Sequence, residues 1–266
     1  TEEIYGCIPD FCKKYWTNSF NWGEDEILNV GIDYHMTYKV DNGDFWGWQA
    51  EHDGWGSGWM DVNNFNPRGD RFAKGLWPGA WYGIRKANLG LQHMDMLVDA
   101  TQEQRNFIEG QLYFFRGWFH FQLIQYFGGL PYIDKVLEDE FKLPRLSYAE
   151  CTELAVADML KAAKLLPINW DKTTTGNPTL GNNDMRINKI MALGYAAKAL
   201  LWAGSPLMNE ESTGSATYNQ EFCNRAAEVF GEMLTLIESG QTQYSMVPFS
   251  DLSEVFYTKG KSSIMP

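Results

Sequence analysis

The sequence lacks any segment that would cross a membrane. No apolar run approaches the ~18 to 20 residues that a bilayer requires, and Thr1-Glu2-Glu3 has neither the basic nor the apolar part of a signal peptide. We therefore expect the chain itself to be soluble. A signal peptide or a lipid-bearing Cys upstream of Thr1 is compatible with this expectation, so the cellular location does not follow from these residues.

Positive charge is also scarce. The 22 Lys and Arg residues face 34 Asp and Glu residues, which gives a net charge of -12 and a pI near 4.8. Such a chain repels phosphate backbones and anionic lipid. Nucleic acid is therefore not an expected partner.

Residues that bind metals or act as nucleophiles are few. The four Cys residues (7, 12, 151 and 223) fit no zinc spacing, and the four His residues lie in no HExxH or triad context. We expect the cysteines to be buried free thiols and His120, in a run of aromatic residues, to be a packed core residue. The sequence predicts no catalytic residue, no metal site and no cofactor.

Aromatic residues, by contrast, are abundant and unevenly placed. They make up 15% of the chain, and eight of the eleven Trp residues lie at positions 16, 22, 46, 48, 55, 59, 77 and 81. Residues 1–76 are rich in Gly, Asn, Asp and aromatics without sustained periodicity, which indicates loops. A hydrophobic fraction of 44% is ample for a packed core in the rest of the chain.

Residues 77–266 carry apolar stripes at helical spacing. We predict five helices, at about 78–98, 101–127, 147–166, 188–203 and 219–239. Capping boxes open two of them, at Thr101 with Gln104 and at Ser147 with Glu150. The small and large residues at Ala155, Met159, Ala162 and Pro167 follow the second helix of a tetratricopeptide repeat. The predicted fold is all-α, a tetratricopeptide-like scaffold with long inserted loops at 127–146 and 204–217 and a loop-rich amino-terminal region.

Four stretches in register resemble the SusD/RagB family. The most recognisable is TQEQRNFIEGQLYFFRGWFHFQLIQYFGGLPYID at 101–134, an aromatic helix that runs into Phe-Gly-Gly-x-Pro. The others are LWPGAWYGIRKANLGLQHMD at 76–95, LPRLSYAECTELAVADMLKAAKLLP at 143–167 and INKIMALGYAAKALLWAGSPLMN at 187–209. The resemblance covers roughly residues 76–257.

The resemblance implies a function as well as a fold. Members of the family are lipid-anchored, surface-exposed proteins of the outer membrane that capture oligosaccharides or polysaccharides, without cleaving them, for a SusC-type TonB-dependent transporter. This chain lacks the lipidated amino-terminal Cys, so its membrane contact would be made only through an anchor that it does not contain. It also ends at Pro266, where the family continues, so the resemblance implies that a carboxy-terminal part is missing.

The candidate glycan-binding residues lie in and just after the Gly-rich stretch 45–61. Trp rings stack on the C–H faces of sugars, and carboxylates and amides bind sugar hydroxyls. The resemblance places sugar-contacting aromatics in this region, where Trp46-x-Trp48 is similar to a stacking pair. The predicted site comprises Trp46, Trp48, Glu51, Asp53, Trp55, Trp59, Asn63 and Asn64.

Other interpretations remain open at this point. One alternative is that these Trp residues pack the loop-rich region onto the helices, a packing role that we expect for the helical pair Trp77 and Trp81. An all-α glycosidase would use Glu51 with Asp53 or Asp61 as an acid and base pair. A tetratricopeptide adaptor would bind a protein segment in its groove but would not need a Trp-rich loop.

Overall fold

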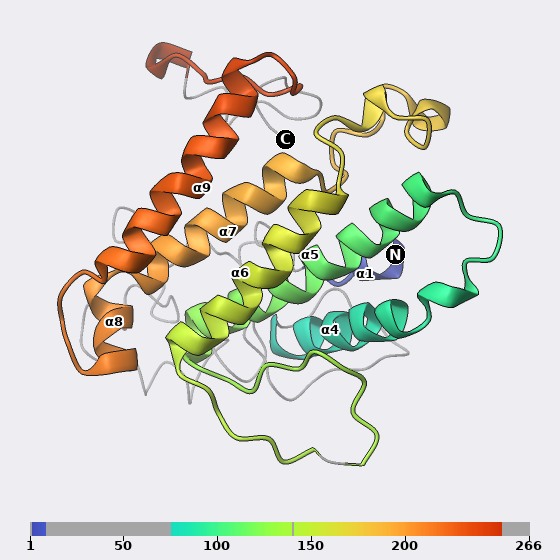
Figure 1. Cartoon of the computed structure of the whole chain (residues 1–266). Helices are drawn as coiled ribbons and strands as arrows, with labels where there is room; N and C mark the ends of the chain where they lie inside the picture. The colour runs from blue at the N-terminus through green and yellow to red at the C-terminus, as the bar shows by residue number, and fades with distance from the viewer. Residues whose placement is uncertain (1, 9–75, 140, 252–266) are drawn as a thin grey trace, which may run out of the picture. The chain divides into compact units, whose positions relative to one another are not determined.

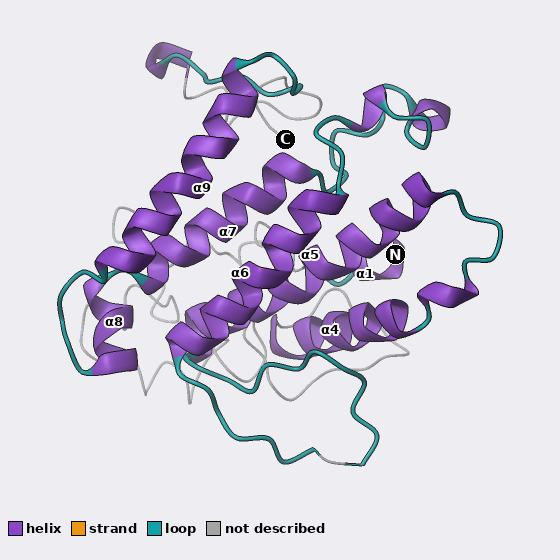
Figure 2. Ribbon diagram, viewed as in Figure 1, coloured by secondary structure: helices purple, strands orange, loops and turns teal. Residues whose placement is uncertain are grey.

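A computed structural model describes residues 2–8, 76–139 and 141–251 (Figure 1). Within these ranges the regular elements are helices and short 3-10 turns, and no strand occurs there (Figure 2). The predicted all-α class is confirmed. No helix in the same ranges has both the length and the apolar character needed to span a bilayer. The chain divides into two compact units, Thr1–Lys86 and Ala87–Pro266, which we describe separately.

The described part of the first unit consists of α1 (Glu2–Tyr5) and the first turns of α4 (Leu76–Gln92). Glu3 joins the two, because its carboxylate accepts a hydrogen bond from the Tyr82 hydroxyl and lies 3.0 Å from the Lys86 ammonium. Trp77 and Trp81 pack edge to face with ring centroids 5.5 Å apart. The predicted packed pair is therefore present, although both rings are only half-buried.

Helix α4 ends earlier than predicted. It stops at Gln92 rather than near Val98, and a 3-10 turn at Met94–Met96 follows. The Arg105 guanidinium donates to the carbonyls of Met94 and Ala100, each over 3.2 Å. A side chain from the next helix thus satisfies carbonyls of the turn that follows α4.

Helix α5 (Gln102–Phe127) is the most buried helix of the second unit. It begins at the predicted capping box, in which Thr101 and Gln104 bond each other's backbone, and ends at Gly128, whose φ is 70°. Aromatic side chains are buried around much of its circumference, as predicted for a core helix. These are Phe107, Phe114, Phe115, Trp118, Phe119 and Phe121.

Three further long helices continue the array. Helices α6 (Tyr148–Leu165), α7 (Lys189–Ala203) and α9 (Gln220–Glu238) follow in order, and each packs on the long helix before it in antiparallel fashion (Figure 1). Gly117 lets α5 approach α6 closely, since a Cβ there would lie 2.6 Å from the Ala155 carbonyl oxygen. The predicted tetratricopeptide positions Ala155, Met159 and Ala162 are all fully buried, which confirms their packing role.

Two helices of the described residues were not predicted, the short α1 and α8. Helix α8 (Pro206–Thr213) occupies most of the expected loop 204–217. Ser205 caps it by accepting from the Met208 amide, and Pro206 stands at its first position, where a missing N–H costs nothing. The same Gly204-Ser205-Pro206 sequence that ends α7 therefore also begins α8.

Candidate functional site

The predicted glycan-binding residues lie outside the described part of the chain. This applies to all eight of them, Trp46, Trp48, Glu51, Asp53, Trp55, Trp59, Asn63 and Asn64, and also to Asp61 and Cys12. They therefore remain predictions. The described residues contain a different feature, a buried polar network at the base of the connection between α5 and α6.

An ion pair between α5 and α6 forms the centre of this network. Arg116 Nε and Nη2 each lie 2.6 Å from one carboxylate oxygen of Asp158, which gives a bidentate pair. Both residues are less than 10% exposed. The Tyr132 hydroxyl donates to Asp158 Oδ2 over 2.6 Å. Burial and the charge of Asp158 raise the pKa of Tyr132, so the phenol stays protonated and keeps donating.

The network also fixes the backbone of the connection. Arg116 Nη1 donates to the Asp134 carbonyl over 2.8 Å and to the Asn88 side-chain oxygen over 3.0 Å. Asn88 Nδ2 donates in turn to the carbonyls of Ile133 (2.9 Å) and Lys135 (3.2 Å). Burial opposes the charge on Arg116, but the bonds to Asp158 outweigh it and raise the Arg116 pKa.

His120 completes the network. Its Nδ1 lies 2.8 Å from the Arg116 carbonyl, and its Nε2 accepts from the Ile133 amide over 3.0 Å. The hydrogen-bond pattern assigns the neutral ring with its proton on Nδ1. Burial, assisted by the Arg116 charge, lowers the pKa of His120 to about 3. The ring stacks on Tyr132 at 3.8 Å, so the prediction of a packed core histidine is confirmed.

The returning segment of the connection, which leads into α6, is anchored separately. Arg145 donates through Nε to the Gly129 carbonyl (2.7 Å) and through Nη2 to the Phe127 carbonyl (2.9 Å). Gly129 is required by close approach, because a Cβ there would lie 2.0 Å from the Leu146 carbonyl oxygen. The buried Cys151 thiol donates to the Leu130 carbonyl over 2.9 Å. It is a free thiol, as predicted, and Cys223 is a free thiol that is only partly buried.

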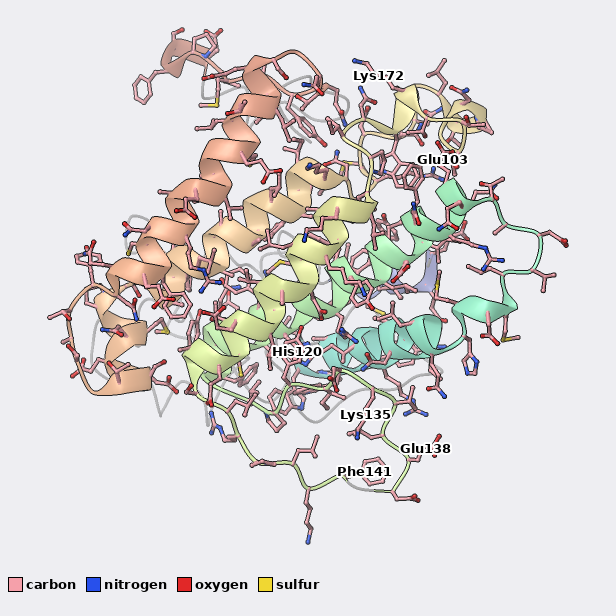
Figure 3. The ribbon with its side chains drawn as sticks, viewed as in Figure 1. Glu103, His120, Lys135, Glu138, Phe141 and Lys172 are labelled. Atoms are coloured by element: carbon pink, nitrogen blue, oxygen red, sulfur yellow. The ribbon has the colours of Figure 1, made fainter. Side chains whose placement is uncertain are left out.

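The outer part of the connection differs from its base. Residues 136–139 and 141–144 make no hydrogen bond within the described structure. The Phe141 side chain is 71% exposed. Figure 3 shows Phe141 and Glu138 on the part of this loop that extends away from the helices.

The chemistry of the network indicates anchoring rather than catalysis. Both Asp158 oxygens are occupied, and the His120 ring uses both nitrogens on the backbone, so neither presents a free group to a substrate. Among the residues that the structure describes, no group of three His, Cys, Asp or Glu side chains is placed to hold a metal ion. Sequence reasoning missed the pairing of Arg116 with Asp158. Its one signal was a charged residue at an inward position in each of two apolar helices.

Comparison with known proteins identifies the family of this chain. Residues 33–201, more than half of the chain, match the SusD-like family described as "Starch-binding associating with outer membrane". The chain is similar to SusD-like protein P2 of Formosa agariphila, with 30% identity over 111 residues, which is 40% of this chain and 22% of that protein.

Two solved structures are similar in fold. Surface glycan-binding protein A from Bacteroides uniformis matches with a TM-score of 0.52 and 21% identity over 70% of this chain and 35% of that one. A laminarin-binding SusD-like protein matches with a TM-score of 0.50 and 19% identity over 71% of this chain and 36% of that one. This chain thus spans well under half the length of these relatives. Because the family match covers more than half of its residues, the chain belongs to the SusD-like family of carbohydrate-binding proteins associated with the outer membrane.

Proposed function

We propose that the full-length protein is lipid-anchored on the cell surface, where it binds an oligosaccharide or polysaccharide and delivers it to a SusC-type TonB-dependent transporter. The observation that carries this proposal is the family match over residues 33–201, which spans the predicted Trp-rich site and most of the helical scaffold. Two relatives named for glycan or laminarin binding support the ligand class.

In this proposal the two parts of the chain have different tasks. Residues 1–76 contribute the binding face, and residues 77–266 form the scaffold that supports it. The four Trp rings at 46, 48, 55 and 59 stack on sugar faces, while Glu51, Asp53, Asn63 and Asn64 accept or donate hydrogen bonds to sugar hydroxyls. The protein captures the glycan and does not cleave it.

Binding and turnover can be measured on the same sample. A glycan array that includes starch and laminarin oligosaccharides should show saturable binding by the full-length protein. Incubation with the bound glycan should then release no new reducing ends. Hydrolysis that is abolished by Glu51→Gln or Asp53→Asn would instead identify a glycosidase, and binding to no glycan at all would favour a protein-binding adaptor.

A further inference from the structure

We infer that α8 is a clip that couples the start of α6 to the start of α9. These two helices run in the same direction, because each packs antiparallel to α7, and α8 lies at the end of the array where both begin (Figure 1). The clip consists of three side chains of α8, namely Asn209, Glu211 and Ser212. Asn209 holds the α9 side, and Glu211 and Ser212 hold the α6 side.

The α6 side of the clip completes a helix cap. The first four backbone N–H groups of a helix have no carbonyl partner within it. At the start of α6, its own capping box satisfies the first and the last of these groups. Helix α8 satisfies the two between them. The Tyr148 amide donates to Glu211 Oε2 over 3.1 Å. The Ala149 amide donates to Ser212 Oγ, also over 3.1 Å.

Helix α5 begins with the same kind of capping box but without a second cap. Among the described residues, no side chain accepts from the amides of Gln102 and Glu103, which correspond to those of Tyr148 and Ala149. Gln102 is exposed, whereas the Tyr148 side chain is fully buried. A helix start that is withdrawn from water needs partners from the protein itself. Helix α8 supplies these partners to α6.

The α9 side of the clip is the buried side chain of Asn209. Its Nδ2 donates to the carbonyls of Ser215 (3.0 Å) and Thr217 (2.9 Å), which fixes the segment that leads into α9. Its Oδ1 accepts from Asn219 Nδ2 over 3.4 Å. Asn219 is the N-cap of α9, because its side chain accepts from the Phe222 amide. Helix α8 therefore holds the cap residue of α9 while it completes the cap of α6.

Both sides of the clip belong to one short helix. Helix α8 has 8 residues, and a helix of this length is only marginally stable without tertiary contacts. Its contacts with the two helix starts therefore stabilise α8 as well as the helices. Loss of the contacts on one side should loosen α8 and, through it, the helix start on the other side. Such coupling between residues that do not touch distinguishes a clip from two independent caps.

Hydrogen–deuterium exchange of the full-length protein, measured by mass spectrometry, tests this coupling. Asn209→Ala removes the side chain that holds the α9 side. The amides of Tyr148 and Ala149, on the α6 side, should then exchange about fivefold faster than in the wild type, as expected for loss of a helix cap. Glu210→Ala, at an exposed neighbour on the same helix, is the matched control and should leave the exchange of these amides unchanged.

The reverse experiment removes the α6 side of the clip. The double variant Glu211→Ala with Ser212→Ala should speed the exchange of the Phe222 amide on the α9 side, because coupling is reciprocal. Faster exchange only on the altered side, in both experiments, would show two independent caps and overturn the clip. Faster exchange in the buried middle of α5 as well would show a general loss of stability, and an equal effect of Glu210→Ala would show that the three side chains are not special. Either of these results also contradicts the inference.

Discussion

The two long connections of the scaffold are ordered in opposite ways. The described residues of the connection 128–147 form no helical turn, and the base of this connection is tied to α5 and α6 by buried charge. Residues 167–188 fold on themselves into 3-10 turns at Trp170–Lys172 and Asn177–Thr179. The comparison shows that a long loop can be fixed either by the helices beneath it or by its own side chains.

The self-contained connection is organised around one ring and one carboxylate. Trp170 is 2% exposed, and its indole N–H donates to the Ile187 carbonyl over 2.9 Å. The Asp171 carboxylate accepts from Asn183 Nδ2 over 2.6 Å and from the Gly181 amide over 3.2 Å. It also contacts α5, because Glu103 accepts from the Thr175 amide over 2.9 Å and the Trp170 ring packs edge to face on Phe107. Removal of one of these hydrogen bonds should therefore disturb this connection without disturbing the helices.

The largest expected difference between the connections comes from removing one carboxylate charge from the side chains that hold each of them. Asp158→Asn should lower the free energy of unfolding by about 3 to 5 kcal/mol, because Arg116 is left as a buried charge without its partner. Asp171→Asn should lower it by only about 1 kcal/mol, since the amide oxygen can still accept a hydrogen bond. Urea unfolding of both variants measures the difference.

The double variant Arg116→Met with Asp158→Leu is the control for this interpretation. Apolar residues of similar size should recover most of the loss of Asp158→Asn. Equal losses for Asp158→Asn and Asp171→Asn would contradict the distinction between the two connections.

Alanine at one glycine of each connection should give the next largest difference. Gly129→Ala places a Cβ against the Leu146 carbonyl and should destabilise the protein by about 1 to 3 kcal/mol or more, because backbone must move. Gly181 has a φ of 74° but open space around it, so Gly181→Ala should cost only about 1 to 2 kcal/mol through backbone strain. Thermal unfolding of both variants tests the order, and a larger loss at Gly181 would contradict it.

The last expected effect concerns pH and the base of the first connection. Because the folded-state pKa of His120 is about 3, below the ordinary value of 6.5, the unfolded chain binds the proton more readily. The neutral His120 ring therefore contributes fully to the free energy of unfolding above pH 6.5. This contribution is lost as the pH falls toward 3, by at most about 1.4 kcal/mol per pH unit.

A neutral substitution isolates this titration. His120→Gln should flatten the pH dependence of the unfolding free energy between pH 6 and 4 compared with the wild type. His93→Gln, at an exposed histidine outside the network, is the matched control for the substitution itself. An identical pH dependence in the wild type and His120→Gln would show that His120 does not carry it.

Local signals in the sequence were sufficient for most of the helices. The capping boxes at Thr101 and Ser147 gave two helix starts to the residue, because a cap is formed by residues three apart. Helix α8 was missed because Gly204-Ser205-Pro206 fits the end of one helix as well as the start of another. The packing of the residues that follow decides whether such a sequence only ends one helix or also begins the next.

The buried network could not be predicted by the same means. Arg116 and Asp158 are separated by 42 positions, and only the packing of α5 on α6 brings them together. His120 was expected in the core, but its bond to the Ile133 amide depends on the path of the connection. The assignment of the glycan-binding site to the Trp-rich segment is based on composition and family resemblance, and its eight candidate residues remain predictions.

The central claim is that Trp46, Trp48, Trp55 and Trp59 bind the glycan while the helices only support them. The most direct measurement is the glycan affinity and the melting temperature of each Trp→Ala variant in the full-length protein. We predict a several-fold loss of affinity, since a stacked ring contributes about 1 kcal/mol, with a melting temperature close to that of the wild type. Unchanged affinity together with a large fall in melting temperature at all four positions, as expected for loss of about 3 to 5 kcal/mol from a core, would contradict the claim.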